Sequence, residues 1–256
     1  MTEAKTPGEE LFEQYLRLNA YSFRYEEEQA GKSKRPDYSI HQNETKILCE
    51  VKDFKPYSFP NRVGSHDPYP GIRKKIEASR IKFREYKGEV CCLVLYNRGD
   101  MRASIEKWFI VFGAMYGDAG MRFEISTETG AAVTAPEFAF LDRGKMWRPK
   151  ANEPQNTTIS SLITIRHVNT GGMNLELYLK NHPAIHGEAI LDLTNEKVGF
   201  DLNERNVGVM VWENAFAARP LPEDIFNGAY DIRFRMTPKG AEIIHKGSGM
   251  PDISFW

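Results

Sequence analysis

Residues 36–54 read PDYSIHQNETKILCEVKDF, and this stretch decides the fold class. The pattern predicts a short strand that starts near Asp37, a turn over residues 41–45 and a second strand over residues 46–54. Another alternating segment, residues 21–27, predicts a strand just before them. Since short connections favour pairing between consecutive strands, the three are expected to form an antiparallel meander.

Alternation along the second strand places two charged side chains together. Glu50 and Lys52 share a face because successive strand side chains point to opposite sides. Asp37 starts the neighbouring strand, so its carboxylate should approach that of Glu50. Carboxylate oxygens are the ligands that Mg²⁺ prefers, so Asp37 and Glu50 are the predicted metal ligands, with the carbonyl of Val51 as an extra one. Lys52 is predicted to orient the attacking water or to stabilise the negative charge that develops on a phosphodiester.

The same residues are compatible with a plain, solvated ion pair at a strand end. Glu-x-Lys also begins at Glu3 and Glu85, and Pro-Asp recurs at residues 251–252. Exposed Glu/Lys pairs are common and contribute little individually. Residues 36–52 differ from these repeats because they combine both elements at short spacing on strand-like segments.

The composition is that of an ordinary globular protein without a global charge signature. The 256 residues are 41% hydrophobic and 27% charged, and the formal net charge is −1. Any nucleic-acid surface must therefore be local. The longest apolar run, residues 108–116, is too short to span a bilayer, and the polar N-terminus is unlike a signal peptide. Cys49, Cys91 and Cys92 lie in apolar runs and are expected to be reduced, which predicts a cytoplasmic protein.

The remaining pattern predicts an α/β fold, a mixed sheet flanked by helices within one domain of residues 1–256. A capping box at Thr6, followed by proline, should start an amphipathic helix. Gly113 to Gly117 suggests close helix packing. The other expected elements are a helix over 72–86, a buried strand over 90–96, a helix over 102–115, mixed strand and loop over 121–155, strands over 161–168 and 207–212, and a loop over 220–228.

Pro36-Asp37 and Glu50-Val51-Lys52, with Phe12-Glu13 on a helix before them and another helix after them, resemble the PD-(D/E)xK nuclease superfamily over residues 8–97. The resemblance implies a restriction-endonuclease-like fold, in which residues 98–256 add a helix, strands and loops that complete and cover the sheet. It implies phosphodiester cleavage with Mg²⁺ as cofactor, or Mn²⁺ in its place, with Asp37, Glu50 and Lys52 in the core roles. DNA is the favoured substrate, and homodimers occur among such nucleases.

The resemblance also implies an acidic site residue on the first helix and a basic site residue on the helix after the motif strand. Glu13 is the preferred acid because it lies at the edge of the apolar stripe, whereas Glu9 belongs to the capping box. The second helix region, residues 71–87, carries seven basic and two acidic side chains. This charge favours contact with phosphate, although a solvated polar face would look the same. The predicted substrate-binding residues are Lys75, which is next to the core residue Ile76, and Arg73, Lys74 and Arg80.

A different class of function remains open at this point. The superfamily includes members that have lost catalysis, so the chain could serve as a nucleic-acid-binding or protein-interaction module. A live site requires Asp37 and Glu50 close enough to share one cation, with Lys52 beside them. Two further signals are weaker. Pro183 between His182 and His186 argues against a helical zinc pair. Residues 213–231 are expected to form a structural wrap, a wall over the site or a surface for a partner.

Overall fold

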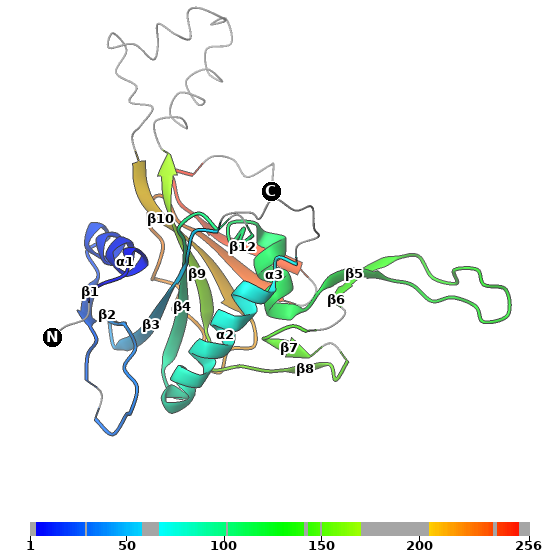
Figure 1. The fold of residues 1–256 in the computed structure, drawn as a ribbon, viewed down its shortest axis with the longest axis horizontal. Coiled ribbons are helices and arrows are strands. Elements are labelled where there is room, and N and C mark those ends of the chain that lie inside the picture. Colours follow the sequence, from blue (N-terminus) through cyan, green and yellow to red (C-terminus); the bar gives the residue numbers. More distant parts are fainter. Residues whose placement is uncertain are drawn as a thin grey trace, which may run out of the picture.

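A mixed eight-stranded sheet forms the centre of the fold (Figure 1), in the order β1-β2-β3-β4-β9-β10-β11-β12. The structure is a computed structural model that describes residues 4–28, 30–57, 67–100, 102–140, 143–148, 150–169, 205–237 and 240–250. Its elements are α1 (Pro7–Leu18), β1 (Ser22–Tyr25), β2 (Tyr38–Gln42), β3 (Thr45–Phe54), α2 (Pro70–Phe83), the 3₁₀ turn η1 (Arg84–Tyr86), β4 (Val90–Asn97), α3 (Trp108–Tyr116), β5 (Ala119–Arg122), β6 (Glu137–Phe140), β7 (Trp147–Arg148), β8 (Glu153–Pro154), β9 (Ser161–Asn169), β10 (Arg205–Asn214), β11 (Ile232–Thr237) and β12 (Gly240–Lys246).

The strand directions confirm the predicted meander and the mixed sheet. β1, β2 and β3 pair antiparallel, β3, β4 and β9 pair parallel, and β10 is antiparallel to β9. β11 runs parallel to β10, and β12 runs antiparallel to β11. Strands from both halves of the chain therefore form one continuous sheet, with the β3–β4 connection made by α2.

Helices cover both faces of the sheet. α1 packs on one face, and α2 and α3 pack on the other (Figure 1). Ile47 and Val51 of β3 belong to the core layer under α1, whereas Leu48 belongs to the layer under α2, as strand alternation predicts. The stripe Ile72, Ile76, Ser79 and Phe83 of α2 is completely buried. All three cysteines are buried and free of disulfide bonds.

The start of α1 confirms the predicted capping box and shows what the helix rests on. The Thr6 hydroxyl accepts from the Glu9 amide, and the Glu9 carboxylate accepts from the Thr6 amide at 2.6 Å. The Gly8 amide donates to Oδ2 of Asp53, at 3.2 Å. A Cβ at Gly8 would lie 2.1 Å from Oδ1 of Asp53, so only glycine lets the helix approach this carboxylate. Asp53 thus points to the α1 face and anchors the positive end of that helix.

The junction of α2 with α3 confirms the close helix packing suggested at Gly113. A Cβ at Gly113 would lie 2.5 Å from Cε1 of Tyr69, so the Tyr69 ring occupies the space a side chain would need. Nη2 of Arg73 donates to the Gly113 carbonyl at 2.9 Å and to Asp118 at 2.6 Å. The Arg73 guanidinium also lies 4.7 Å from the centre of the Tyr69 ring. The first turn of α2 is therefore fixed to α3 by packing and by a buried ion pair.

The third helix begins later than the sequence pattern predicts. α3 starts at Trp108 rather than at residue 102. The Asn97 side chain explains the delay, because its Nδ2 donates to the carbonyls of Asp100 and Ala103 and its Oδ1 accepts from the Asp100 amide. These hydrogen bonds tie the Asn97 side chain to the backbone of Asp100 and Ala103 and compete with helix formation there.

The segment between β10 and β11 is a structural wrap on the α1 face. Leu221, Ile225 and Phe226 are buried in the core layer that α1 covers. Arg233 is 2% exposed and donates to the carbonyls of Pro222, Glu223 and Ile225, and it pairs with Glu213. One buried guanidinium therefore holds the loop over the sheet, which favours the structural interpretation of residues 213–231.

Strands β5 and β6 form a two-stranded arm that projects from the body of the molecule (Figure 1). A cluster of large apolar side chains on it is exposed: Met121, Phe123, Ile125 and Val133. No helix among the described residues has the length and apolar character needed to cross a membrane.

Candidate functional site

Asp37 is held across from Glu50 by the end of the β2–β3 pairing. The last residue pair of the ladder is Tyr38 with Cys49, so Asp37 and Glu50 occupy the next opposed positions. Oδ2 of Asp37 accepts a hydrogen bond of 2.7 Å from the amide of Val51. The side chain thereby replaces the missing strand partner of Val51, and it is fixed on the face of the sheet that carries Glu50.

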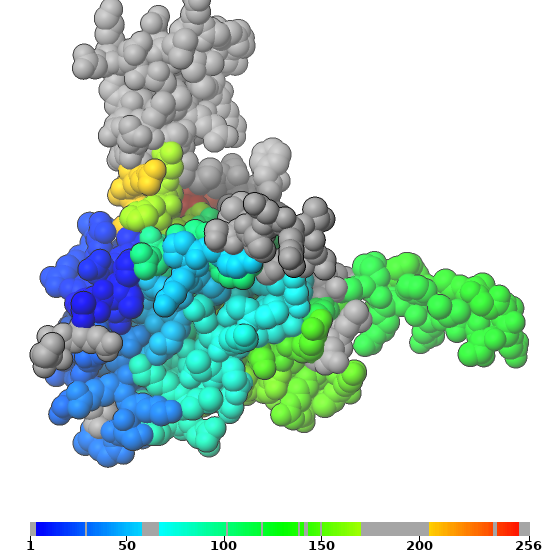
Figure 2. Space-filling model, in the orientation of Figure 1, coloured from blue at the N-terminus to red at the C-terminus, as the bar shows by residue number. Residues whose placement is uncertain are grey.

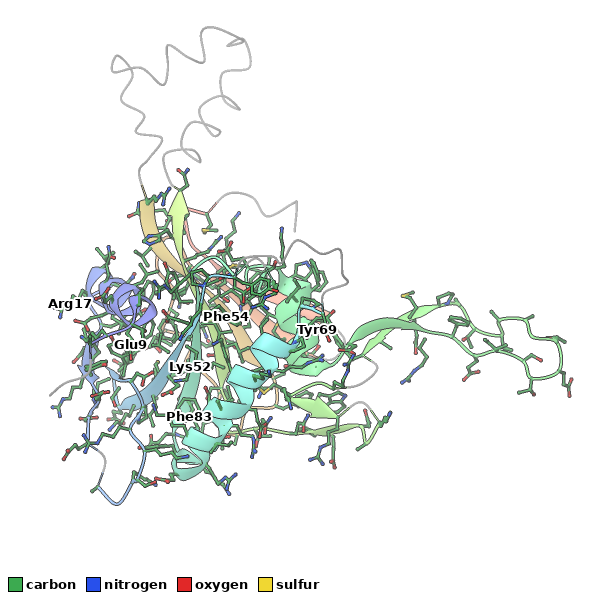
Figure 3. The ribbon with its side chains drawn as sticks, viewed as in Figure 1. Glu9, Arg17, Lys52, Phe54, Tyr69 and Phe83 are labelled. Carbon is green, nitrogen blue, oxygen red and sulfur yellow. The ribbon has the colours of Figure 1, made fainter. Side chains whose placement is uncertain are left out.

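Glu50 and Lys52 both point to the α2 face, as alternation along β3 predicts. Glu50 is 2% exposed, and its Oε1 pairs with the Lys52 ammonium at 2.5 Å. Figure 3 labels Lys52 beside α2. The structure therefore brings Asp37, Glu50 and Lys52 together.

A second ammonium group, from Lys82 near the end of α2, joins the two carboxylates. Its Nζ lies 3.1 Å from Oδ1 of Asp37 and also pairs with Oε2 of Glu50. The two carboxylates consequently share one cation. The oxygens of Asp37 and Glu50 thus lie close enough to contact the same ammonium group, which is the proximity that a shared metal ion would also need.

At both Glu50 and Lys82, burial shifts the pKa in one direction and the opposite charges nearby shift it in the other. Burial, with the negative charge of Asp37, raises the pKa of Glu50, although Lys82 and Lys52 act to lower it. Burial acts to lower the pKa of Lys82, but the charges of Asp37 and Glu50 prevail and raise it. Lys82 therefore stays an ammonium ion, whereas burial and the charge of Asp37 make the Glu50 carboxylate easier to protonate than an exposed one.

Lys75 lies on the same side of α2 as Lys82, two helical turns earlier. Its Nζ donates to the carbonyl of Asp53 at 2.7 Å and lies 4.4 Å from the centre of the Phe54 ring. Burial lowers the pKa of Lys75, and the positive charge of Lys52 lowers it further. The predicted substrate-binding residue Lys75 is thus placed beside Lys52, at the edge of the carboxylate cluster.

Glu13 is not brought to this cluster. It lies on α1, which covers the opposite face of the sheet, and Figure 3 labels Glu9 and Arg17 of the same helix there. Its carboxylate pairs with Lys5 and Arg17, and these hydrogen bonds lower its pKa despite the opposing effect of burial. The sequence could not show which face α1 would cover, so the predicted role of Glu13 beside the metal ligands has no geometric support.

The other three predicted substrate-binding residues lie on the far side of α2. Arg73 is 6% exposed and is held by Gly113 and Asp118, Arg80 pairs with Glu77, and Lys74 is exposed. They therefore belong to a different surface from the one formed by Asp37, Glu50 and Lys52. Lys82 is one of the seven basic residues of this helix region, and charge alone does not distinguish it from the others. Its spacing of seven from Lys75 was the available sign that both occupy one stripe.

The donor set fits a hard divalent cation that keeps part of its water shell. Among the described residues there is no group of three or more His, Cys, Asp or Glu side chains that could hold a metal. Mg²⁺, however, commonly uses one or two carboxylates with waters and substrate phosphate. Both oxygens of Glu50 are engaged by ammonium groups, Oε1 by Lys52 and Oε2 by Lys82, so a divalent cation bound here would take the place of Lys82 between the two carboxylates. Because the N–H and C=O of one strand residue point to the same side, the Val51 carbonyl faces the edge that Asp37 covers.

The histidine pair His182 and His186 lies outside the described residues. Comparisons of the chain with protein-family models, with curated proteins and with solved structures gave no match. The interpretation of the site accordingly rests on its geometry and chemistry.

Proposed function

We propose that this protein is a Mg²⁺-dependent nuclease that hydrolyses phosphodiester bonds of nucleic acid, DNA being the favoured substrate, on a restriction-endonuclease-like sheet. The observation that carries the proposal is that Asp37 and Glu50, from adjacent strands, lie close enough together to contact one ammonium group, that of Lys82. Lys52, on the same face, completes the arrangement that the Pro-Asp and Glu-x-Lys motifs predict.

The residues of this site divide the chemistry among them. Asp37 and Glu50 would hold the cation, with the Val51 carbonyl as a further ligand. When bound, Mg²⁺ would supply a Lewis acid and a more acidic bound water. Lys52 fixes one oxygen of Glu50 and offers its ammonium to the attacking water or to charge developing on phosphorus. Lys82 neutralises the two carboxylates, which would otherwise repel each other.

One observation favours a second function, a nuclease-like module that binds nucleic acid or a protein without cleaving it. Lys82 and Lys52 already saturate Glu50 with ion pairs, so the cluster is electrically satisfied by the chain alone. A purely structural cluster would look the same. The two functions differ in whether a divalent cation binds and whether phosphodiester bonds break.

The test is cleavage of supercoiled, linear and single-stranded DNA and of RNA, with Mg²⁺ or Mn²⁺ and with EDTA. Wild type should cleave at least one substrate in a metal-dependent manner, and Asp37→Ala and Glu50→Gln should lose at least about 100-fold of that activity. Glu44→Gln is the matched control because Glu44 lies in the exposed β2–β3 turn. Equal activity of wild type and Asp37→Ala would overturn the assignment. A homodimer, which cutting both strands of a duplex would favour, is a prediction to be checked by the mass in solution.

A further inference from the structure

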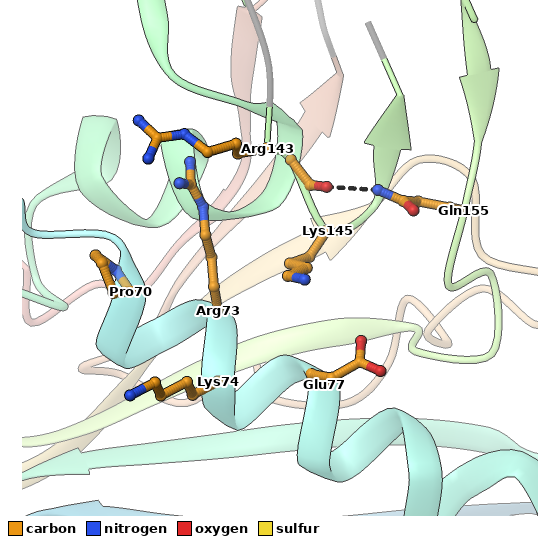
Figure 4. Close-up of a pocket in the computed structure, with 8 residues that line it drawn as sticks. Pro70, Arg73, Lys74, Glu77, Arg143, Lys145 and Gln155 are labelled. Atoms are coloured by element: carbon orange, nitrogen blue, oxygen red, sulfur yellow. Dashed lines mark hydrogen bonds between the residues drawn. The ribbon is translucent and has the colours of Figure 1, made fainter.

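On the side of α2 that faces away from the carboxylates, two hollows lie between this helix and a neighbouring segment that starts at Arg143, and a third lies within that segment. Figure 2 shows the helix, in cyan, and the yellow-green part of this segment side by side on the surface. The largest hollow has a volume of about 520 Å³ and lies between α2 and residues 143–145 (Figure 4). Its neighbours measure about 510 Å³ and about 240 Å³. Gln155 lines all three, so they adjoin one another at this side chain. We name this surface the basic groove and define its walls as the residues of 70–80 on α2, and those of 143–148 and 150–156, that line the three hollows.

The wall opposite α2 is a fixed part of the fold. The amides of Lys145 and Met146 donate to the carbonyl of Met115, at 2.8 and 2.6 Å, and so satisfy the end of α3. Nε2 of Gln155 donates to the carbonyls of Gly144 and Trp147. A Cβ at Gly144 would lie 2.4 Å from the backbone of Tyr116, which shows how closely this segment approaches α3. The groove is therefore formed before any ligand arrives.

The lining of the basic groove is strongly positive although the chain as a whole has a formal net charge of −1. Seven basic side chains line it, against the single acidic residue Glu77. Four arginines are engaged with Glu77, Asp118 and Glu153. Within the described part of the chain, the ammonium groups of Lys74 and Lys145 have no ion-pair partner. These two lysines, one on each wall, are the charges available to a ligand.

The side-chain amide that lines all three hollows is already hydrogen-bonded. Gln155 donates to two carbonyls and accepts from Nε of Arg148, at 3.2 Å. The Trp147 ring is stacked on Phe216, with 4.8 Å between ring centres, so one of its faces is covered. An open groove with cationic walls, whose Gln155 amide is engaged within the chain, matches a phosphate backbone rather than a small molecule.

We infer that the basic groove binds the phosphodiester backbone of a nucleic acid, without regard to base sequence, at a distance from the point of cleavage. The choice of nucleic acid as ligand rests on the proposed function. α2 separates the groove from the Asp37–Glu50 cluster, with Lys75 and Lys82 on one side and Lys74 on the other. One polymer crossing α2 would contact both surfaces, so the groove extends the contact beyond the scissile bond.

The test measures binding in EDTA, which prevents cleavage, by fluorescence anisotropy of labelled duplex and single-stranded oligonucleotides of two unrelated sequences. Lys74→Gln/Lys145→Gln removes both available charges from the groove. Lys87→Gln/Arg122→Gln is the matched control, because it removes equal charge from exposed positions outside the groove. Thermal unfolding checks that each variant folds. The groove variant should weaken the Kd about tenfold and lower the slope of log Kd against log salt by about one to two, whereas the control should change the Kd less than twofold.

The outcomes separate this inference from the proposed function. If the groove variant weakens binding as expected but wild type cleaves nothing with any metal, the groove stands and the nuclease assignment fails. If wild type cleaves but the groove variant binds like the control, the groove inference fails alone. Equal affinity for a poly-glutamate peptide and for DNA of the same charge, or a Kd that differs tenfold between the two sequences, would also overturn it.

Discussion

Oδ2 of Asp37 accepts a 2.7 Å hydrogen bond from the amide of Val51, so the carboxylate is tied to the strand that carries Glu50. An amide oxygen can accept the same bond. We therefore expect Asp37→Asn to fold like wild type, with a melting temperature within a few degrees, while losing the negative charge that a divalent cation needs. Cleavage should fall at least about 100-fold, and Mn²⁺ affinity should fall as well.

Glu44→Gln provides the comparison for this variant, because it removes one carboxylate from an exposed turn. Mn²⁺ binding can be followed by electron paramagnetic resonance, which does not depend on activity. Wild-type Mn²⁺ affinity in Asp37→Asn would show that Asp37 is not a metal ligand. A large loss of stability would instead assign the residue a structural role.

Lys82 neutralises Asp37 and Glu50 together, and its removal should leave two carboxylates facing each other. Lys82→Met keeps most of the side-chain volume but removes the ammonium. Because Glu50 is buried, we expect the free energy of unfolding to fall by about 2 kcal/mol or more, measured by urea denaturation at neutral pH. Mg²⁺ at millimolar concentration should restore part of this loss.

The double variant Lys82→Met/Glu50→Gln separates charge repulsion from packing. If repulsion causes the loss, removing one carboxylate should recover most of it. Lys87→Met is the neutral control, since Lys87 is exposed just beyond η1. A double variant as unstable as Lys82→Met alone would mean that Lys82 acts through packing.

The pKa of Glu50 predicts how stability changes with pH. Burial and Asp37 raise this pKa in the folded protein above the ordinary value of 4.5. A raised carboxyl pKa means that the folded state binds the proton more tightly than the unfolded state. The contribution of Glu50 to the free energy of unfolding therefore falls as pH rises from 4.5 through its folded-state pKa. The loss is about 1.4 kcal/mol for each unit of pKa.

Glu50→Gln cannot titrate at this position, so the difference in unfolding free energy between wild type and this variant isolates the effect. That difference should shift against wild type as pH rises from about 4 to 7, measured by chemical denaturation in EDTA. Other carboxylates titrate alike in both proteins and largely cancel. A difference that moves in favour of wild type would mean that the ion pairs with Lys52 and Lys82 outweigh burial.

Local rules predicted the parts of the site that lie on one strand. Alternation placed Glu50 and Lys52 on one face, and the ladder to β2 brought Asp37 opposite Glu50. These relations depend on residues close in sequence. The side chain of Asn97 delayed α3 for an equally local reason, but its competition with the backbone leaves no periodic signal.

The features of the site that the sequence pattern does not predict depend on how the helices pack on the sheet. Lys82 reaches the carboxylates because α2 crosses β3 with one particular rotation, and Glu13 is remote because α1 covers the other face. Charge and spacing show that a helix has a basic or acidic side. They do not show what that side will face, because tertiary packing sets the rotation.

Gly113 lets α2 approach α3 closely. For Gly113→Ala, this packing predicts a loss of stability, whereas helix propensity predicts a gain. Alanine in a helix interior is usually more stable than glycine by about 1 kcal/mol. A Cβ at Gly113, however, would lie 2.5 Å from Cε1 of Tyr69, whose ring also packs on the buried Arg73. We expect the clash to prevail, so Gly113→Ala should lower the free energy of unfolding by about 1–3 kcal/mol. Gly88→Ala, with open space around the added Cβ, should not show that loss. In a Tyr69→Ala background the cost of Gly113→Ala should largely disappear, and an undiminished cost there would place the strain elsewhere in α3.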